Sequence, residues 1–165
     1  MGRHTAWSWP AALATAAALL LLLAAVLYGT RPALGDDDRA AAVGSARTTL
    51  ESLLSYSSDG FDAHVAEVKP LLGAPFREEF AKVAGTDVKP LAEKNKATVQ
   101  AKVFEAGVMD TTGTAGAGTT VRVMAFVNQA TTSSVQKTPA IDQNRVIATM
   151  TKVGDRWLLS ALEAY

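Results

Sequence analysis

The spacing of the apolar residues changes near position 95, and this change limits the fold more than any other feature of the chain. Before it, apolar residues recur at helical spacing over residues 37–55, 59–72 and 75–94. Gly85 and Pro90 predict an interruption of the third segment. After the change, polar and apolar residues alternate, which is typical of half-buried strands. Helices followed by an antiparallel meander predict an α+β domain in which about three helices pack on one face of a curved four-stranded sheet.

The second half of the chain predicts four strands with short connections. Gly-rich residues 111–118 join the first two strands, and Gly154-Asp155 forms the turn between the last two. The first strand loses its alternation at residues 104–106, as strands do at a β-bulge. Because no helix follows residues 111–118, their glycines belong to a hairpin and not to a phosphate-binding loop. The predicted strands cover residues 98–110, 119–129, 143–153 and 156–163.

An uncharged apolar run over residues 11–28 predicts a membrane-spanning helix. At ~1.5 Å per residue, a helix of this length spans about 27 Å, close to the ~30 Å hydrocarbon core of a bilayer. Trp7 and Trp9 precede the run and Tyr28 ends it, and such rings favour the two bilayer interfaces. The alternative is a cleaved signal peptide, with Ala33-Leu34-Gly35 as its cleavage site. The predicted organisation is a tail (1–10), a transmembrane helix (11–28), a linker (29–35) and a domain (36–165).

The charges do not fix the orientation of this helix, and they argue against nucleic acid as a partner. Arg3 precedes the helix whereas Arg31 and Arg39 follow it, so the positive-inside rule favours neither side. The 165 residues include 16 basic and 16 acidic side chains, without a basic stripe that would neutralise phosphates. The absence of cysteine excludes disulfides, thiolate catalysis and cysteine-based zinc sites.

Four short motifs follow the apolar run in a fixed order. They are a Leu-Leu-Ser-Tyr stretch before Phe61-Asp62, a Gly-x-x-Phe-Arg step at residues 73–77, a Phe-Val-Asn-Gln strand end at 126–129 and a Gly-x-Arg-Trp-Leu hairpin at 154–158. With these motifs the chain resembles the Mce-associated membrane proteins over nearly its whole length.

This resemblance implies both a fold and a role. The fold is a cone-shaped domain of the nuclear-transport-factor and ketosteroid-isomerase type, held by a single-pass helix on the envelope side of an actinobacterial plasma membrane. The role is that of a non-enzymatic accessory protein that supports or stabilises an Mce-type lipid import complex through protein contacts. No cofactor is implied, while a homo-oligomer and a bound lipid are both compatible with this role.

The titratable residues of the domain offer little for catalysis or metal binding. His64 is the only histidine after the apolar run, and Tyr56, Asp62 and Glu67 are near it in the sequence. Since helical spacing puts His64 at the border of an apolar face, we expect a boundary residue and no catalytic site. We expect no metal site either, because the domain has no second histidine and no cysteine. The alternative is an isomerase or cyclase that uses His64 and Asp62.

A carrier of lipids or small molecules is an alternative from another functional class. Its ligand would lie inside the cone, between residues 50–54 of the first helix and the strand residues Val99, Val121 and Val123.

The strand at residues 119–129 predicts a surface for a protein partner. One face of this strand is uniformly apolar and is expected to form the core: Val121, Val123, Ala125 and Val127. The other face should be solvated, yet it carries two large apolar side chains with polar residues at both ends: Arg122, Met124, Phe126 and Asn128. An exposed apolar patch with a polar rim is typical of an interaction surface. The alternative is that the loop at residues 131–138, or the opposite end of a curled sheet, covers Phe126.

Overall fold

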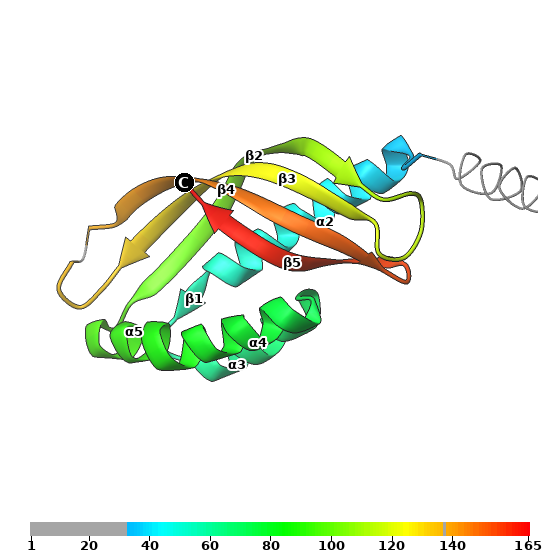
Figure 1. The fold of residues 1–165 in the computed structure, drawn as a ribbon. Coiled ribbons are helices and arrows are strands. Elements are labelled where there is room, and N and C mark those ends of the chain that lie inside the picture. Colours follow the sequence, from blue (N-terminus) through cyan, green and yellow to red (C-terminus); the bar gives the residue numbers. More distant parts are fainter. Residues whose placement is uncertain (1–32, 137) are drawn as a thin grey trace, which may run out of the picture. The chain divides into compact units, whose positions relative to one another are not determined.

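One sheet of five antiparallel strands organises the domain, and each strand pairs with its neighbours along the chain (Figure 1). The strands are β1 (Tyr56–Ser57), β2 (Thr98–Thr112), β3 (Thr120–Thr132), β4 (Ala140–Val153) and β5 (Arg156–Ala164). The predicted α+β architecture is confirmed, but the prediction of four strands is wrong. The additional strand β1 pairs Tyr56 with Val99 and Ser57 with Thr98. Two residues are too few to produce an alternating pattern in a sequence, so pattern analysis does not detect such a strand.

The computed structural model describes residues 33–136 and 138–165. The predicted tail, the predicted transmembrane helix and the first residues of the linker lie outside this part of the chain. Within it, no helix has the length and apolar character needed to cross a membrane. Leu34–Tyr165 form one compact unit.

Helix α2 (Asp36–Leu54) lies across one face of the sheet (Figure 1). Three acidic residues occupy its first turn, where negative charge interacts favourably with the helix dipole. The helix ends where Ser55 adopts an extended conformation and leads into β1. Its buried stripe begins with the small residues Ala42 and Ala46, which allow close approach to the sheet, and continues with Leu50 and Leu53.

The remaining helices lie on the same side of the sheet (Figure 1). α3 (Phe61–Val68) continues into a short 3₁₀ turn, η1 (Lys69–Leu71). α4 (Ala74–Val83), the π-helical turn η2 (Ala84–Val88) and α5 (Lys89–Asn95) then follow without a break. The interruption expected near Gly85 and Pro90 is therefore a wide turn within one helical segment. Pro90, which has no N–H to donate, is the second residue of α5 and follows directly after this wide turn.

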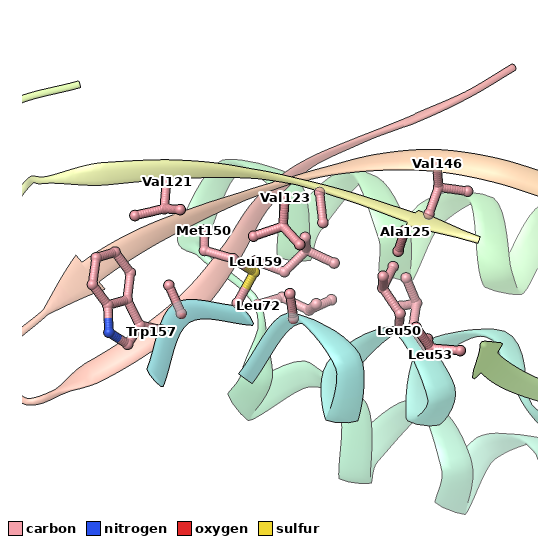
Figure 2. Packing of buried hydrophobic residues seen from close by; sticks show 14 of the residues in the cluster. Leu50, Leu53, Leu72, Val121, Val123, Ala125, Val146, Met150, Trp157 and Leu159 are labelled. Atoms are coloured by element: carbon pink, nitrogen blue, oxygen red, sulfur yellow. The ribbon is translucent and has the colours of Figure 1, made fainter. Parts of the chain in front are cut away.

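The core fills the space between the helices and the inner face of the sheet. Figure 2 shows Leu50 and Leu53 of α2 packed with buried strand residues. Val121, Val123, Ala125 and Val127 of β3 are fully buried, as their alternation predicts. Leu72, Met150 and Leu159 complete the centre of this cluster.

The sheet departs from regular pairing at three places. In β2 the register shifts between Val103 and Glu105, which confirms the disturbance predicted at residues 104–106. A second shift between Val108 and Asp110 and a third between Thr149 and Met150 were not expected. At each β2 shift the strand has one residue more than its partner, and extra residues of this kind bend a strand and increase its twist.

Candidate protein-contact surface

The outer face of the sheet, opposite the helices, carries three exposed aromatic side chains. Phe104 of β2 is 75% exposed, Phe126 of β3 is 47% exposed and Tyr165, after β5, is 64% exposed. We call these three residues the aromatic patch. Aromatic rings of this size are mostly covered in folded proteins, so a cluster of them on one face needs an explanation.

Two opposite charges flank Phe126 in the sheet. In the strand register, Glu105 of β2 lies opposite Phe126 on one side and Arg145 of β4 lies opposite it on the other. The Arg145 guanidinium carbon lies 5.5 Å from the centroid of the Tyr165 ring. The Tyr165 N–H donates to the Arg145 carbonyl oxygen at 2.9 Å. The patch therefore has a fixed cation next to an aromatic ring on one side and a carboxylate on the other.

The last residues of the chain are held in place by a further contact. The Tyr165 hydroxyl donates to Glu163 Oε2 at 2.7 Å. This hydrogen bond, together with the negative charge of Glu163, raises the pKa of Tyr165 above its ordinary value. The hydrogen bonds of the Tyr165 hydroxyl and N–H thus hold its ring beside the Arg145 guanidinium.

The patch borders a hollow of about 630 Å³. Apolar rings and amides both line it, so the hollow presents hydrogen-bonding groups beside hydrophobic ones. We call it the outer hollow, and its lining residues are Phe104, Glu105, Phe126, Asn128, Gln143, Asn144, Arg145 and Tyr165.

Helix α2 positions the bulge that exposes Phe104. At the bulge, Phe104 and Glu105 together oppose the single residue Phe126. On the other edge of β2, Arg47 Nη1 donates to the Val103 carbonyl oxygen at 2.6 Å, and the Val103 N–H donates to Glu51 Oε1 at 3.0 Å. Arg47 and Glu51 are four residues apart and so lie on one face of the helix. Side chains of α2 therefore pair the backbone groups of β2 next to the bulge.

The predicted partner-binding residues divide into two groups. Phe126 and Asn128 line the outer hollow, whereas Arg122 and Met124 do not. Arg122 instead pairs with Asp110 at 3.0 Å, and Met124 is half-buried. The loop after β3 does not cover Phe126, which is 47% exposed, and the Ser134 N–H of this loop donates to the Asn95 carbonyl oxygen at 2.8 Å.

Pattern analysis did not find Phe104, Arg145 and Tyr165. Their neighbourhood depends on the bulge and on the register of β2 to β5, and alternation within one strand cannot give this. The only available signal was the disturbance at residues 104–106, which predicted the bulge without showing where its side chains point.

His64 is half-buried beside the rings of Tyr56 and Phe61, at centroid distances of 6.4 and 6.2 Å. Burial lowers the pKa of His64, and the Leu53 backbone and the charge of Glu67 oppose this effect only in part. Asp62 forms an ion pair with Lys89 at 2.6 Å, and within the described chain it makes none with His64. Across the same residues, no group of three His, Cys, Asp or Glu side chains could hold a metal ion.

No family model matches the chain. Two curated relatives are both from Mycobacterium tuberculosis: the uncharacterized protein Rv1362c of strain H37Rv and the uncharacterized protein MT1407 of strain CDC 1551 / Oshkosh. Each is 30% identical to this chain over 120 residues, which is 73% of this chain and 52% of the relative. The chain thus spans about half the length of the curated relatives it matches.

Solved structures share the fold at low sequence identity. The periplasmic domain of DotI has a TM-score of 0.66 at 12% identity, over 80% of this chain and 96% of that one. CagV of Helicobacter pylori, a VirB8 homolog of the type IV secretion system, has a TM-score of 0.58 at 9% identity, over 76% and 96%. Agrobacterium tumefaciens VirB8 has a TM-score of 0.51 at 9% identity, over 81% and 95%. These domains and the present one have the same α+β fold.

Proposed function

We propose that this protein is a non-enzymatic, membrane-anchored accessory protein that works through protein contacts made by the outer face of its sheet. The observation that carries the proposal is the aromatic patch, with Phe104 75% and Phe126 47% exposed beside the outer hollow. Covering apolar surface of this kind contributes about 25 cal/mol per Å². Aromatic and Arg side chains are also the residues most enriched at the centres of protein interfaces.

The charges around the patch support specific recognition. Glu105 and Arg145 flank Phe126, so a partner must present the opposite charges on either side of an apolar contact. Charge arrangements of this kind contribute to orientation and partner choice more than to affinity.

The location and the partner belong to the same proposal. The uncharged run at residues 11–28 supports a single-pass anchor in the plasma membrane. The fold that the domain shares with the periplasmic domain of DotI supports a position on the envelope side. The motifs that resemble Mce-associated membrane proteins support an Mce-type lipid import complex as the partner. The alternative partner at this surface is a second copy of the chain, which the test below can also detect.

The test compares the full-length protein with the variant Phe126→Arg after crosslinking and purification from its own membranes. We expect the wild type to retain its partner and Phe126→Arg to lose it, with unchanged circular dichroism. The matched control is Val153→Arg, which alters an exposed apolar residue of the neighbouring strand β4. Val153 is eight residues from Arg145 along the strand, or about 26 Å at ~3.3 Å per residue.

The outcomes separate the parts of the proposal. The whole proposal is supported if Mce subunits are recovered with the wild type and with Val153→Arg but not with Phe126→Arg. If other proteins are recovered with these two samples and not with Phe126→Arg, the contact surface is supported and the Mce partner is refuted. Equal recovery with Phe126→Arg refutes the surface. If Phe126→Arg does not fold, Tyr165→Arg at the end of the chain tests the same patch.

A further inference from the structure

A second hollow lies on the helical side of the sheet and has a volume of about 430 Å³. We call it the inner pocket. Side chains from the end of α2, from α3, α4 and η2, and from Gln129 and Leu162 of the sheet form its walls. Its volume is within the range of about 300–1,000 Å³ that is typical of small-molecule sites. Among the described residues, the inner pocket and the outer hollow share no lining side chain.

The inner pocket lies only in part where the carrier alternative put it: Leu53 and Leu54 line it, whereas Val99 does not. Val121 and Val123 are fully buried in the core and do not line it, and neither does Leu50. The pocket begins where this core ends, at Leu53 and Leu54, and extends toward the helices.

Apolar side chains line most of this pocket without filling it. Leu54, Phe76, Phe80 and Val88 line it and are only half-buried, and Val83 is 42% exposed. A molecule in the pocket would remove this apolar surface from water, which favours binding by about 25 cal/mol per Å² covered. The walls therefore favour a ligand with a hydrocarbon body.

The π-helical turn η2 forms one wall of the pocket. The Lys89 N–H donates to the Ala84 carbonyl oxygen, five residues earlier, so this turn holds one residue more than an α-helical turn. Ala84 and Val88 of η2 line the pocket. Ala92 of α5 packs in a small buried cluster with Phe61 and Ala84, the cluster of Phe61. Single π-helical turns occur frequently at functional sites, which is an observation independent of the pocket itself.

The polar residues of the pocket determine the charge of its ligand. Among the described residues that line it, none is a lysine or an arginine, and the only charged one is Glu79, which is exposed. An anionic head group would find no cation here and would meet a carboxylate. The uncharged hydrogen-bonding residues are Tyr56, His64 and Gln129. Asn144 Nδ2 donates to Gln129 Oε1 at 3.0 Å, so the amide NH₂ of Gln129 is the end that can donate to a ligand.

We propose that the inner pocket binds an uncharged lipid-like molecule, with its hydrocarbon body against Phe76, Phe80 and Val88 and one hydroxyl group that accepts from Gln129 and donates to His64. Burial lowers the pKa of His64, which agrees with this ligand: the neutral imidazole directs its N–H to the Leu53 backbone, and its other ring nitrogen can accept a hydrogen bond from a ligand hydroxyl. The inference does not depend on the outer hollow or on the proposed protein partner.

The experiment uses the full-length chain in phosphatidylcholine vesicles with one of two photoreactive probes. The first probe is hexadecanol with a diazirine on its chain, and the second is hexadecanoic acid with the same diazirine. After illumination, labelled peptides are quantified by mass spectrometry. We expect hexadecanol to label the peptides containing residues 53–64 and 76–88. Labelling by hexadecanoate should be at least about tenfold weaker, because a buried anion without a partner costs more than 1.4 kcal/mol.

Two variants test whether the pocket is the site. Val88→Phe fills it and should reduce the labelling of these peptides by at least about tenfold, which corresponds to 1.4 kcal/mol. Leu91→Phe is the matched control, since Leu91 is 62% exposed on α5 and does not line the pocket. Unchanged labelling of Val88→Phe overturns the proposal, and equal labelling by hexadecanoate overturns the neutral ligand. If circular dichroism shows that Val88→Phe does not fold, Leu54→Phe is used to fill the pocket instead, and unchanged labelling of that variant overturns the proposal. Phe126→Arg should label as the wild type does, so the two proposals fail or succeed separately.

Discussion

The carboxylate of Glu51 accepts a hydrogen bond from the backbone N–H of Val103 at 3.0 Å, directly before the bulge at Phe104. Lys102 Nζ approaches the same carboxylate at 3.0 Å. Ser55, directly after the end of α2, accepts a hydrogen bond from the Ala101 N–H at 2.9 Å. β1 pairs only with the first two residues of β2. Along the rest of this edge, these side chains accept backbone N–H groups of β2 that no strand pairs. The contact of helix and strand and the exposed position of Phe104 thus depend on the same residues.

Replacement of Glu51 by Ala should destabilise the domain. It leaves the Val103 N–H without its acceptor next to the bulge, and an unpaired buried donor costs about 1–3 kcal/mol. Glu51→Gln is the matched control, because its amide oxygen can still accept this hydrogen bond. Urea unfolding followed by circular dichroism measures both variants. Equal stability of Glu51→Ala and Glu51→Gln would show that the hydrogen bond contributes nothing.

The same carboxylate should make stability depend on pH in the acid range. Burial alone would raise the pKa of Glu51, but the Val103 N–H and Lys102 outweigh it, and the pKa lies below its ordinary value of 4.5. Below about pH 4.5 the unfolded chain therefore binds a proton that the folded chain does not, and the free energy of unfolding falls as the pH falls through the folded pKa. Unfolding curves between about pH 3 and 6 should show a smaller decrease for Glu51→Gln. The same decrease in both proteins would assign the effect to other carboxylates.

Local periodicity was sufficient for the helices and the long strands, but not for the candidate surface. The helix predicted at residues 37–55 is α2 (Asp36–Leu54), because apolar residues recur at helical spacing along its buried side, from Ala42 to Leu53. The alternation in β3 identified the four buried side chains of that strand. Strand β1 and the approach of Tyr165 to Arg145 depend on pairing between distant residues. A single sequence shows no pattern for such contacts.

The wide turn η2 illustrates a different limit. Gly85 and Pro90 are signals for the end of a helix, and they predicted an interruption. The chain instead keeps its helical path through one π-helical turn, because Ala84, the first residue of that turn, and Ala92, in α5, are both buried in the cluster of Phe61. This packing outweighs the preference of Gly85 and Pro90 for ending a helix.

His64 should make the domain less stable in mildly acidic solution. Its ordinary pKa is 6.5, and burial lowers the pKa in the folded state. Below about pH 6.5 the unfolded chain binds a proton that the folded chain excludes, so the free energy of unfolding decreases with falling pH in this window. Thermal midpoints at about pH 5.5 and 7.5 should differ less for His64→Gln than for the wild type. An equal or larger difference for His64→Gln would show that His64 is charged in the folded protein.

Deletion of Phe104 should remove the most exposed ring of the aromatic patch while leaving the core in register. At the bulge, Phe104 and Glu105 oppose one residue, so removal of Phe104 leaves Glu105 opposite Phe126 and Ala106 opposite Ala125. The inward residues Val103 and Ala106 then keep their orientation, because the shortened strand alternates regularly. We expect a folded protein, with a circular dichroism spectrum like that of the wild type, that has lost its partner in the crosslinking assay. Deletion of Val99 is the matched control: it lies in a regular part of β2, where the loss of one residue turns the neighbouring side chains to the wrong face, and it should unfold the domain. If deletion of Phe104 is as destabilising as deletion of Val99, the bulge is a requirement of the fold and not a device that exposes Phe104.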